Sequence, residues 1–269
     1  MEKLFLEPLE ISKTLRNVGE QKAHTTLFEL FVFGILAGIY IAFGANVATV
    51  VLSGGTLDAG FAKFLAGSVF SVGLMLVLIP GSELFTGNIL MVIGFIYRRY
   101  SLIKVLRNWF VVYLGNLLGS IFIAWLVFRS GLLTQGGDLT ALGGVAAKIT
   151  EAKLQLSFAE ALYRGILCNM LVCLAVIMCI ASKSIIGKIF GIYFPIMTFV
   201  ASGYEHSVAN MYFLPAGLMA KNEFTSNFFS IFNNLIPVTI GNIIGGFLVV
   251  LLHPKVEERI IRIFLKNHK

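Results

Sequence analysis

Charged residues are scarce in this 269-residue chain. They make up 13% of it, about half of the roughly 25% that is usual in soluble domains. A soluble protein of this length would need far more polar side chains to cover its surface. With 57% hydrophobic residues and a mean hydropathy of +0.87, the composition excludes a soluble enzyme, a nucleic-acid-binding module and a disordered chain. It predicts an all-α membrane protein.

Cysteines and cofactor motifs are scarce too. The three cysteines, Cys168, Cys173 and Cys179, lie in one apolar stretch, and no pair has the spacing of a metal or redox site. The chain has no zinc motif, phosphate loop, nucleotide fingerprint or nucleophile elbow. We therefore expect no enzymatic activity, no cofactor and no metal. A membrane subunit of a redox complex is a remote alternative, and one intramembrane histidine gives no bis-histidine haem site.

Six apolar segments are long enough to cross the roughly 30 Å hydrocarbon core of a membrane, which takes about 20 residues of helix. They lie at 27–52, 62–96, 107–128, 157–181, 188–220 and 227–252. The second contains a Pro-Gly-Ser-Glu run at 80–83 and the fifth a Ser-Gly-Tyr-Glu-His run at 202–206. Both predict helices broken at membrane depth, which are tolerated where the freed backbone lines a polar cavity. We expect an amino-terminal arm at 1–26, a channel domain at 27–252 and a basic tail at 253–269.

The distribution of lysine and arginine predicts the orientation. Fifteen of them fall in the arm, the tail and the loops after segments two and four, against about five on the other side. Cytoplasmic loops carry this excess, so both termini are expected in the cytoplasm of a cell (inner) membrane protein. The same count explains the net charge of +7 without a nucleic-acid partner.

The two halves of the chain, at about 27–130 and 157–252, share their pattern of polar and small residues. Glu29 and Glu160 each precede a Gly-Ile-Leu run by five residues, and Glu83 and Glu205 each precede an asparagine by five. A further Asn and Gly-Asn pattern recurs in segments three and six, and the three offsets are 131, 122 and 126. Three segments per half is an odd number, so the second half must enter the membrane from the opposite side. This predicts an inverted repeat of three plus three, whose interface is the default transport path.

Polar residues at the two breaks are the candidate transport site. His206 is the only histidine in a predicted span, and an ionisable residue at membrane depth is a functional-site hypothesis by default. We expect Asn169 and Asn210 to hydrogen-bond it and to set its tautomer. At the first break, Thr86 could bond a passing ion or the freed backbone. The alternative is a kink whose polar groups only satisfy one another.

Two glutamates and a lysine complete the candidate residues. Glu83 and Glu205 could be ion ligands, but we favour a structural role in which each caps free backbone N–H groups at a helix start. Lys153 lies just before segment four on the predicted outer side. A lysine at a pore mouth attracts anions, although a lone lysine is usually only a solvated surface charge.

The sequence resembles the formate/nitrite transporter family over all six predicted spans. The resemblance is carried by 83–88 (ELFTGN), 164–169 (RGILCN), 201–211 (ASGYEHSVANM) and 234–242 (NLIPVTIGN). It implies an aquaporin-like protomer in a homopentamer, with His206 as the central pore histidine, Thr86 in the loop that breaks segment two, and Lys153 in the outer vestibule. It also implies hydrophobic constrictions, at Phe70, Leu74, Leu84, Phe85 and Phe199. The paired Asn-Pro-Ala motifs of aquaporins are absent, which counts against a water channel.

The resemblance implies transport of a small monovalent weak-acid anion, with formate first and then nitrite or hydrosulfide. A bare anion pays several kcal/mol or more to enter a low-dielectric constriction, whereas the neutral acid avoids most of that cost. The sequence therefore suggests that the anion takes a proton from His206, or from water relayed beside it. The rival hypothesis keeps His206 protonated in a broad anion channel without proton coupling. The anion itself, the direction of flux and any gating by the arm stay open.

Overall fold

The computed structural model describes residues 3–55, 57–253 and 256, and helices make up most of them. The elements, in chain order, are α1 (Pro8–His24), α2 (Leu27–Ser53), α3 (Ala59–Leu78), α4 (Phe85–Asn88), η1 (Ile89–Met91), α5 (Val92–Ile96), α6 (Leu102–Arg129), β1 (Thr134–Gln135), β2 (Asp138–Leu139), α7 (Ala141–Leu154), α8 (Phe158–Ala181), α9 (Ile185–Ala201), α10 (Ser207–Ala220), α11 (Phe224–Asn227), η2 (Phe228–Ser230) and α12 (Ile231–Leu251). The short antiparallel hairpin β1–β2 corrects the expectation of a purely helical chain. Helix α7 was also not predicted.

Within the described residues, five helices are long and apolar enough to cross a membrane. They are α2, α3, α6, α8 and the run Phe224–Leu251 that ends in α12. Large apolar side chains such as Phe110, Phe122 and Phe194 point outward from these and neighbouring helices. Exposed apolar surface on this scale indicates contact with lipid or with other protein. The chain is therefore a helical membrane-type protein.

The predicted second and fifth segments are interrupted. Helix α3 ends before a loop at 79–84, and α9 ends before a loop at 202–206. Each loop turns at a glycine with positive φ, Gly81 (+96°) and Gly203 (+72°), a conformation that other residues rarely adopt. Each turn is also closed by a backbone hydrogen bond that reaches back five residues, from Ser82 to Val77 and from Tyr204 to Phe199. The two breaks are thus built alike.

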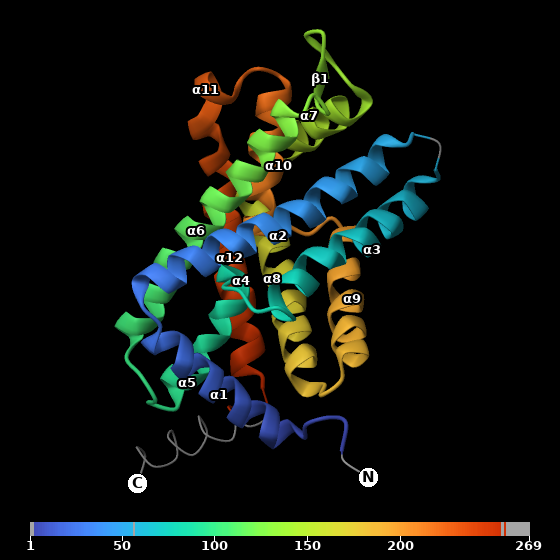
Figure 1. Cartoon of the computed structure of the whole chain (residues 1–269). Helices are drawn as coiled ribbons and strands as arrows, with labels where there is room; N and C mark the ends of the chain where they lie inside the picture. Colours follow the sequence, from blue (N-terminus) through green and yellow to red (C-terminus); the bar gives the residue numbers. More distant parts are fainter. Residues whose placement is uncertain (1–2, 56, 254–255, 257–269) are drawn as a thin grey trace.

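The two loops lie inside the helix bundle. Helix α2 packs along α6 and α3, α8 packs along α12 and α9, and α3 packs against α9. The short α4 after the first break contacts α6, α8, α12 and α10, so it lies at the centre of the molecule (Figure 1). Helix α10, after the second break, contacts α6, α7 and α2. Both helices that follow a break therefore start in the interior.

Glycines let the principal helix pairs approach closely. A Cβ built at Gly115 on α6 would lie 2.7 Å from the carbonyl oxygen of Phe31, and one at Gly241 on α12 would lie 2.2 Å from that of Leu162. Real Cβ atoms essentially never show such distances. Backbone contact of this kind is the usual role of small residues between membrane helices. It holds α6 against α2 and α12 against α8.

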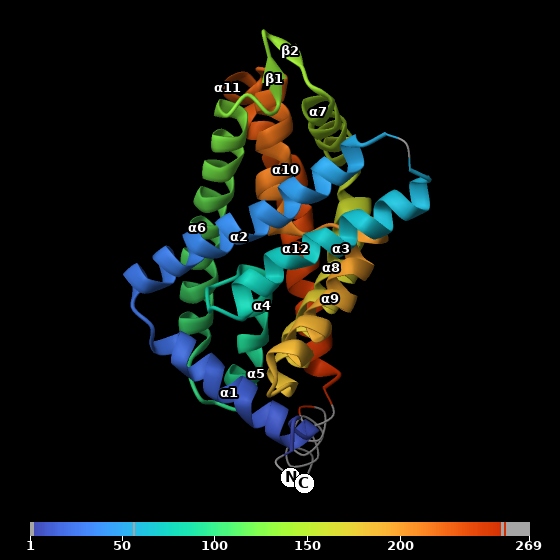
Figure 2. The ribbon, with the colours of Figure 1, turned by 45° about the vertical axis from the view of Figure 1, so that its right-hand side comes forward.

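The molecule has two distinct ends. Helices α1 and α5 lie at one end, called the α1 end, while α7, the β1–β2 hairpin and α11 lie at the other, called the α7 end (Figures 1 and 2). Helix α1 occupies most of the predicted arm 1–26. The basic tail was predicted at 253–269. Only residues 253 and 256 of it are among the described residues, so the basic tail stays a prediction.

Candidate functional site

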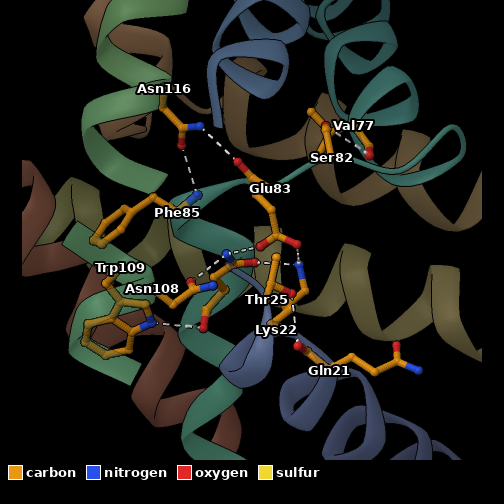
Figure 3. Close-up of polar contacts among 11 residues, drawn as sticks. Gln21, Lys22, Thr25, Val77, Ser82, Glu83, Phe85, Asn108, Trp109 and Asn116 are labelled. Atoms are coloured by element: carbon orange, nitrogen blue, oxygen red, sulfur yellow. Dashed lines mark hydrogen bonds and ion pairs between the residues drawn. The ribbon is translucent and has the colours of Figure 1, made fainter. Parts of the chain in front are cut away.

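A partly buried ion pair stands at the first break. The Lys22 ammonium, on α1, lies 2.7 Å from Glu83 Oε1 and donates to Asn88 Oδ1 at 2.9 Å. The Asn88 amide, on α4, donates in turn to Glu83 Oε2 at 2.6 Å and to Asn108 Oδ1 at 2.8 Å. Figure 3 shows Glu83 reaching down from the loop to meet Lys22, with Asn108 beside them. The first loop is thereby fixed to α1, α4 and α6.

The second break carries the same set of contacts. The Lys153 ammonium, on α7, lies 2.8 and 3.0 Å from the two oxygens of Glu205. Asn210, on α10, donates to Glu205 Oε2 at 2.6 Å and to Asn234 Oδ1 at 2.7 Å. Asn234 also donates to the backbone carbonyl of Lys153 at 3.0 Å. The side chains of this second pair are 15% and 5% exposed, against 21% and 12% for Lys22 and Glu83.

The prediction that Glu83 and Glu205 cap helix starts is wrong. Each carboxylate instead accepts hydrogen bonds from one lysine and one asparagine side chain. The lysine lies close enough to neutralise the carboxylate, so the carboxylate is not free to cap backbone N–H groups. The backbone at the first break is served instead by Asn116 of α6. Its side-chain oxygen accepts from the Phe85 N–H at 2.9 Å, and its amide donates to the carbonyls of Glu83 (2.9 Å) and Gly34 (2.7 Å).

Asn242 of α12 serves the second break in the same manner. Its side-chain oxygen accepts from the Ser207 N–H at 2.9 Å, and its amide donates to the carbonyls of Glu205 (3.0 Å) and Gly165 (2.8 Å). A buried polar group without a partner costs several kcal/mol, so an amide that satisfies three backbone groups suits a broken helix at this depth.

Thr86 and His206 meet across the two breaks. The Thr86 hydroxyl lies 2.8 Å from His206 Nε2, and both side chains are buried. The Ala209 N–H donates to His206 Nδ1 at 3.1 Å, so Nδ1 is an acceptor. The geometry therefore selects the neutral imidazole with its proton on Nε2, and that N–H donates to the Thr86 oxygen. The sequence placed both residues in the site, and the structure brings them into contact.

The expected hydrogen bonds from Asn169 and Asn210 to His206 are not made, and that prediction is wrong. Asn169 donates to the carbonyls of Asn242 (2.7 Å) and Thr86 (3.3 Å), so it supports the backbone beside the Thr86–His206 contact. Its buried side-chain oxygen has no partner within the described residues. Asn210 belongs to the Glu205 cluster. Both ring nitrogens of His206 are already taken by Thr86 and Ala209.

The apolar residues predicted as constrictions are all buried but do not form one group. The Phe199 ring stacks on the His206 ring at 5.8 Å between centroids, and Phe70 meets Phe199 edge to face at 5.6 Å. Leu74 lies one helical turn after Phe70 on α3. Leu84 borders a cavity at the α1 end. Phe85 instead packs on Trp109 and Tyr113 of α6.

The cavity at the α1 end has a volume of about 510 Å³ and reaches the first break. Its lining includes Lys22, Glu83, Leu84 and Asn88, and also Lys188 of α9. Lys22 was missed by the sequence analysis because it stands in the polar arm. The signal was present, since Lys22 precedes Lys153 by 131 residues, the same offset that relates Glu29 to Glu160.

Two lysines at the α7 end, Lys153 and Lys221, are also paired. The charge of Lys153 is matched by Glu205, and Lys221 lies 2.9 Å from Glu151 and 3.2 Å from Glu223. Hydrogen bonds from the Lys221 ammonium to Glu151 and Glu223 raise the pKa of Lys221 above its ordinary value. Among the described residues, no three His, Cys, Asp or Glu side chains gather as metal ligands would.

Comparisons with known proteins agree with one another. The family model described as "Formate/nitrite transporter" matches residues 9–255. A "Probable formate transporter" of Methanothermobacter thermautotrophicus is 46% identical over 264 residues, covering 91% of this chain and 94% of that protein. Among solved structures, an "FNT family ion channel" superimposes with a TM-score of 0.81 at 29% identity, covering 91% and 96% of the two chains. A "Pentameric formate channel with formate bound" superimposes with a TM-score of 0.73 at 35% identity, covering 83% and 94%.

Proposed function

Because the chain belongs to the formate/nitrite transporter family, we propose that it conducts a small monovalent weak-acid anion across the cell membrane. Formate is the first candidate, and nitrite and hydrosulfide follow. The relatives that carry an assigned role are formate channels and transporters, not enzymes. A similar solved structure is of a pentameric formate channel with formate bound, which supports that order.

The proposed architecture has six spans in two inverted halves. Segment two would be α3 with α4–α5, and segment five would be α9 with α10. Support comes from the matched contacts at the breaks, where Lys22, Glu83 and Asn116 correspond to Lys153, Glu205 and Asn242. We further propose a homopentamer, by likeness to the pentameric neighbour, embedded in the bilayer. The α1 end would face the cytoplasm, as the lysine and arginine count predicts.

In the proposed mechanism the anion crosses as its neutral acid. Phe70 and Phe199 form an apolar wall beside His206, where a bare charge would lose its hydration. Loss of hydration favours the protonated form of a carboxylate. The neutral acid could then exchange hydrogen bonds with the Thr86 hydroxyl and the His206 ring as it passes. The proton that crosses with it would be relayed from bulk water through water held beside the His206 ring, which is neutral at rest. The relay therefore depends on that ring.

The observation that carries this proposal is the Thr86–His206 contact at 2.8 Å. The rival channel needs a permanently protonated His206 as a fixed positive site. A proton on Nδ1 would point at the Ala209 N–H, which already donates to that atom at 3.1 Å. A permanently protonated His206 would therefore break the hydrogen bond from the Ala209 N–H in the interior. Passage of the neutral acid leaves that hydrogen bond intact.

The test is uptake into proteoliposomes of formate, nitrite, hydrosulfide and chloride, at about pH 5 and about pH 7.5, on either side of the ordinary histidine pKa. The variants are His206→Asn and, as a matched control, His24→Asn, in which the same replacement is made on α1. We expect wild-type weak-acid uptake to rise steeply at the lower pH with little chloride flux. His206→Asn should lose the pH dependence and admit chloride, and His24→Asn should behave as wild type.

Two outcomes would count against the proposal. Similar chloride and weak-acid fluxes at both pH values in the wild type would make the protein a broad anion channel. Unchanged flux and pH dependence in His206→Asn would remove His206 from the transport path altogether.

A further inference from the structure

The cavity at the α1 end carries one uncompensated positive charge. Three charged side chains line it, Lys22, Glu83 and Lys188. Lys22 and Glu83 form an ion pair at 2.7 Å, so their charges cancel to first order. Lys188, half-buried near the start of α9, has no ion-pair partner among the described residues. The net charge of the lining is therefore +1, and Lys188 supplies it.

A thiol lies in the field of that charge. Cys179 of α8 lines the same cavity and is 5% exposed. Cys179 and Lys188 both line this cavity, from the packed helices α8 and α9. The rate at which charged reagents modify the Cys179 thiol therefore reports the electrostatic potential inside the cavity.

The lysines at the breaks cannot supply this charge. Lys153 is tied to Glu205 in the same manner as Lys22 is tied to Glu83, so each recurring pair is neutral. An ammonium that already donates to a carboxylate offers an anion little net attraction. Lys188 differs from both because it lines the cavity and has no counter-charge among the residues that the structure describes.

We propose that Lys188 is the docking residue for the transported anion at the α1 end of the path. The proposal rests on the transport function proposed above. The ligand class is a small monovalent anion such as a carboxylate. A cavity of about 510 Å³ is much larger than formate, so the anion arrives with water around it. Lys188 therefore concentrates anions by charge and does not select them by shape.

The expected magnitude follows from Coulomb's law. A unit charge about 6 Å from the anion, at an effective dielectric constant between about 40 and 80, raises the local anion concentration roughly three- to tenfold. The effect should fade as salt shortens the Debye length from about 20 Å at low ionic strength to a few Å near 1 M. The salt dependence of anion binding therefore distinguishes attraction by charge from recognition by shape.

The first experiment measures the potential without any transport. The purified full-length protein in detergent is treated with an anionic and a cationic methanethiosulfonate reagent, the sulfonatoethyl and the trimethylammonioethyl compounds. Peptide mass spectrometry follows the Cys179 peptide. The ratio of the two rates removes the reactivity of the thiol itself. We expect Lys188→Gln to lower the anionic-to-cationic ratio at least fivefold, and Lys188→Arg to preserve it.

Lys13→Gln is the matched control, because it removes one positive charge from the exposed face of α1, outside the cavity lining. It should leave the ratio unchanged. An unchanged ratio in Lys188→Gln, or an equal fall in Lys13→Gln, would overturn the proposal.

The second experiment measures formate flux in proteoliposomes, with potassium sulfate added to ionic strengths of about 20 mM and about 500 mM. Lys188→Gln should raise the half-saturating formate concentration three- to tenfold at low salt and change little at high salt, while the maximal flux is retained. A labelling effect without a shift in half-saturation would overturn docking on the transport path. Failure of the wild type to carry formate would instead refute the proposed function, and the labelling ratio would still report on Lys188.

Discussion

Removal of Lys153 should be one of the most destabilising single changes available in this chain. Its ammonium lies 2.8 and 3.0 Å from the two oxygens of Glu205, whose side chain is 5% exposed. At an effective dielectric constant of about 20, the attraction over 2.8 Å is about 6 kcal/mol before desolvation is counted. Lys153→Met removes that attraction and leaves Glu205 as a buried, unpaired carboxylate. Breaking such a pair typically costs about 3–5 kcal/mol.

Lys22→Met is the matched variant. The distance from Lys22 to Glu83 is 2.7 Å, so the direct attraction is the same within the precision of the estimate. The difference is solvent, because the Lys22 and Glu83 side chains are 21% and 12% exposed. Water can therefore screen Glu83 when its partner is removed, and we expect a smaller loss, about 1–3 kcal/mol.

The assay is unfolding of the purified protein by sodium dodecyl sulfate, followed by far-UV circular dichroism, together with the double variant Lys153→Met/Glu205→Gln. The neutral glutamine side chain in that variant can still accept from Asn210, so the double variant should recover most of the stability lost in Lys153→Met. If the double variant is less stable than Lys153→Met by the full cost of a separate Glu205→Gln change, the two residues are not coupled and the reasoning fails. Equal losses of stability in Lys153→Met and Lys22→Met would refute the argument that water screens Glu83 better than Glu205.

Two further predictions concern the helix contacts and the broken backbone. Gly241→Ala should lower stability by about 1–3 kcal/mol because its Cβ would meet the Leu162 carbonyl, whereas Gly144→Ala, with nothing within 4 Å, should leave the melting temperature unchanged or slightly higher. Equal melting temperatures for the two variants would contradict the close approach. Asn116→Ala leaves the buried Phe85 N–H without its acceptor, so hydrogen–deuterium exchange at that amide should accelerate and stability should fall by about 1–3 kcal/mol. Undiminished protection of that amide would show that Asn116 does not hold the first break.

The sequence was sufficient to locate both breaks. Gly81 and Gly203 stand inside long apolar runs beside polar residues, and the structure turns at both of them. The length of the apolar runs also located most of the helices. Helix α7 and the β1–β2 hairpin were missed because they lie between apolar runs, where hydropathy gives no signal.

Contacts within the site were harder to predict than its members. His206 and Thr86 were both chosen, but their direct contact joins residues 120 positions apart and depends on how the two halves pack. The glutamates were given the wrong partners because Lys22 and Lys153 both lie outside the predicted spans, and only the packing of α1 and α7 brings them to the breaks. Asn169 was placed correctly near the centre, yet its amide supports backbone carbonyls, a choice that only the three-dimensional arrangement of loops decides.

The contacts at the two breaks match except at Thr86 and His206, and this exception bears on how the two halves evolved. An offset of 122 residues takes Glu83 to Glu205 and Asn88 to Asn210, but it takes Leu84 to His206 and Thr86 to Val208. The two residues that hydrogen-bond at the centre thus each correspond to an aliphatic residue in the other half. If the halves descend from one duplicated ancestor, the duplicates kept the contacts that hold a broken helix and diverged at the two residues that hydrogen-bond to each other at the centre. Each half of the chain then supplies one partner of the Thr86–His206 hydrogen bond. Loss of either half would leave the other partner without its hydrogen bond.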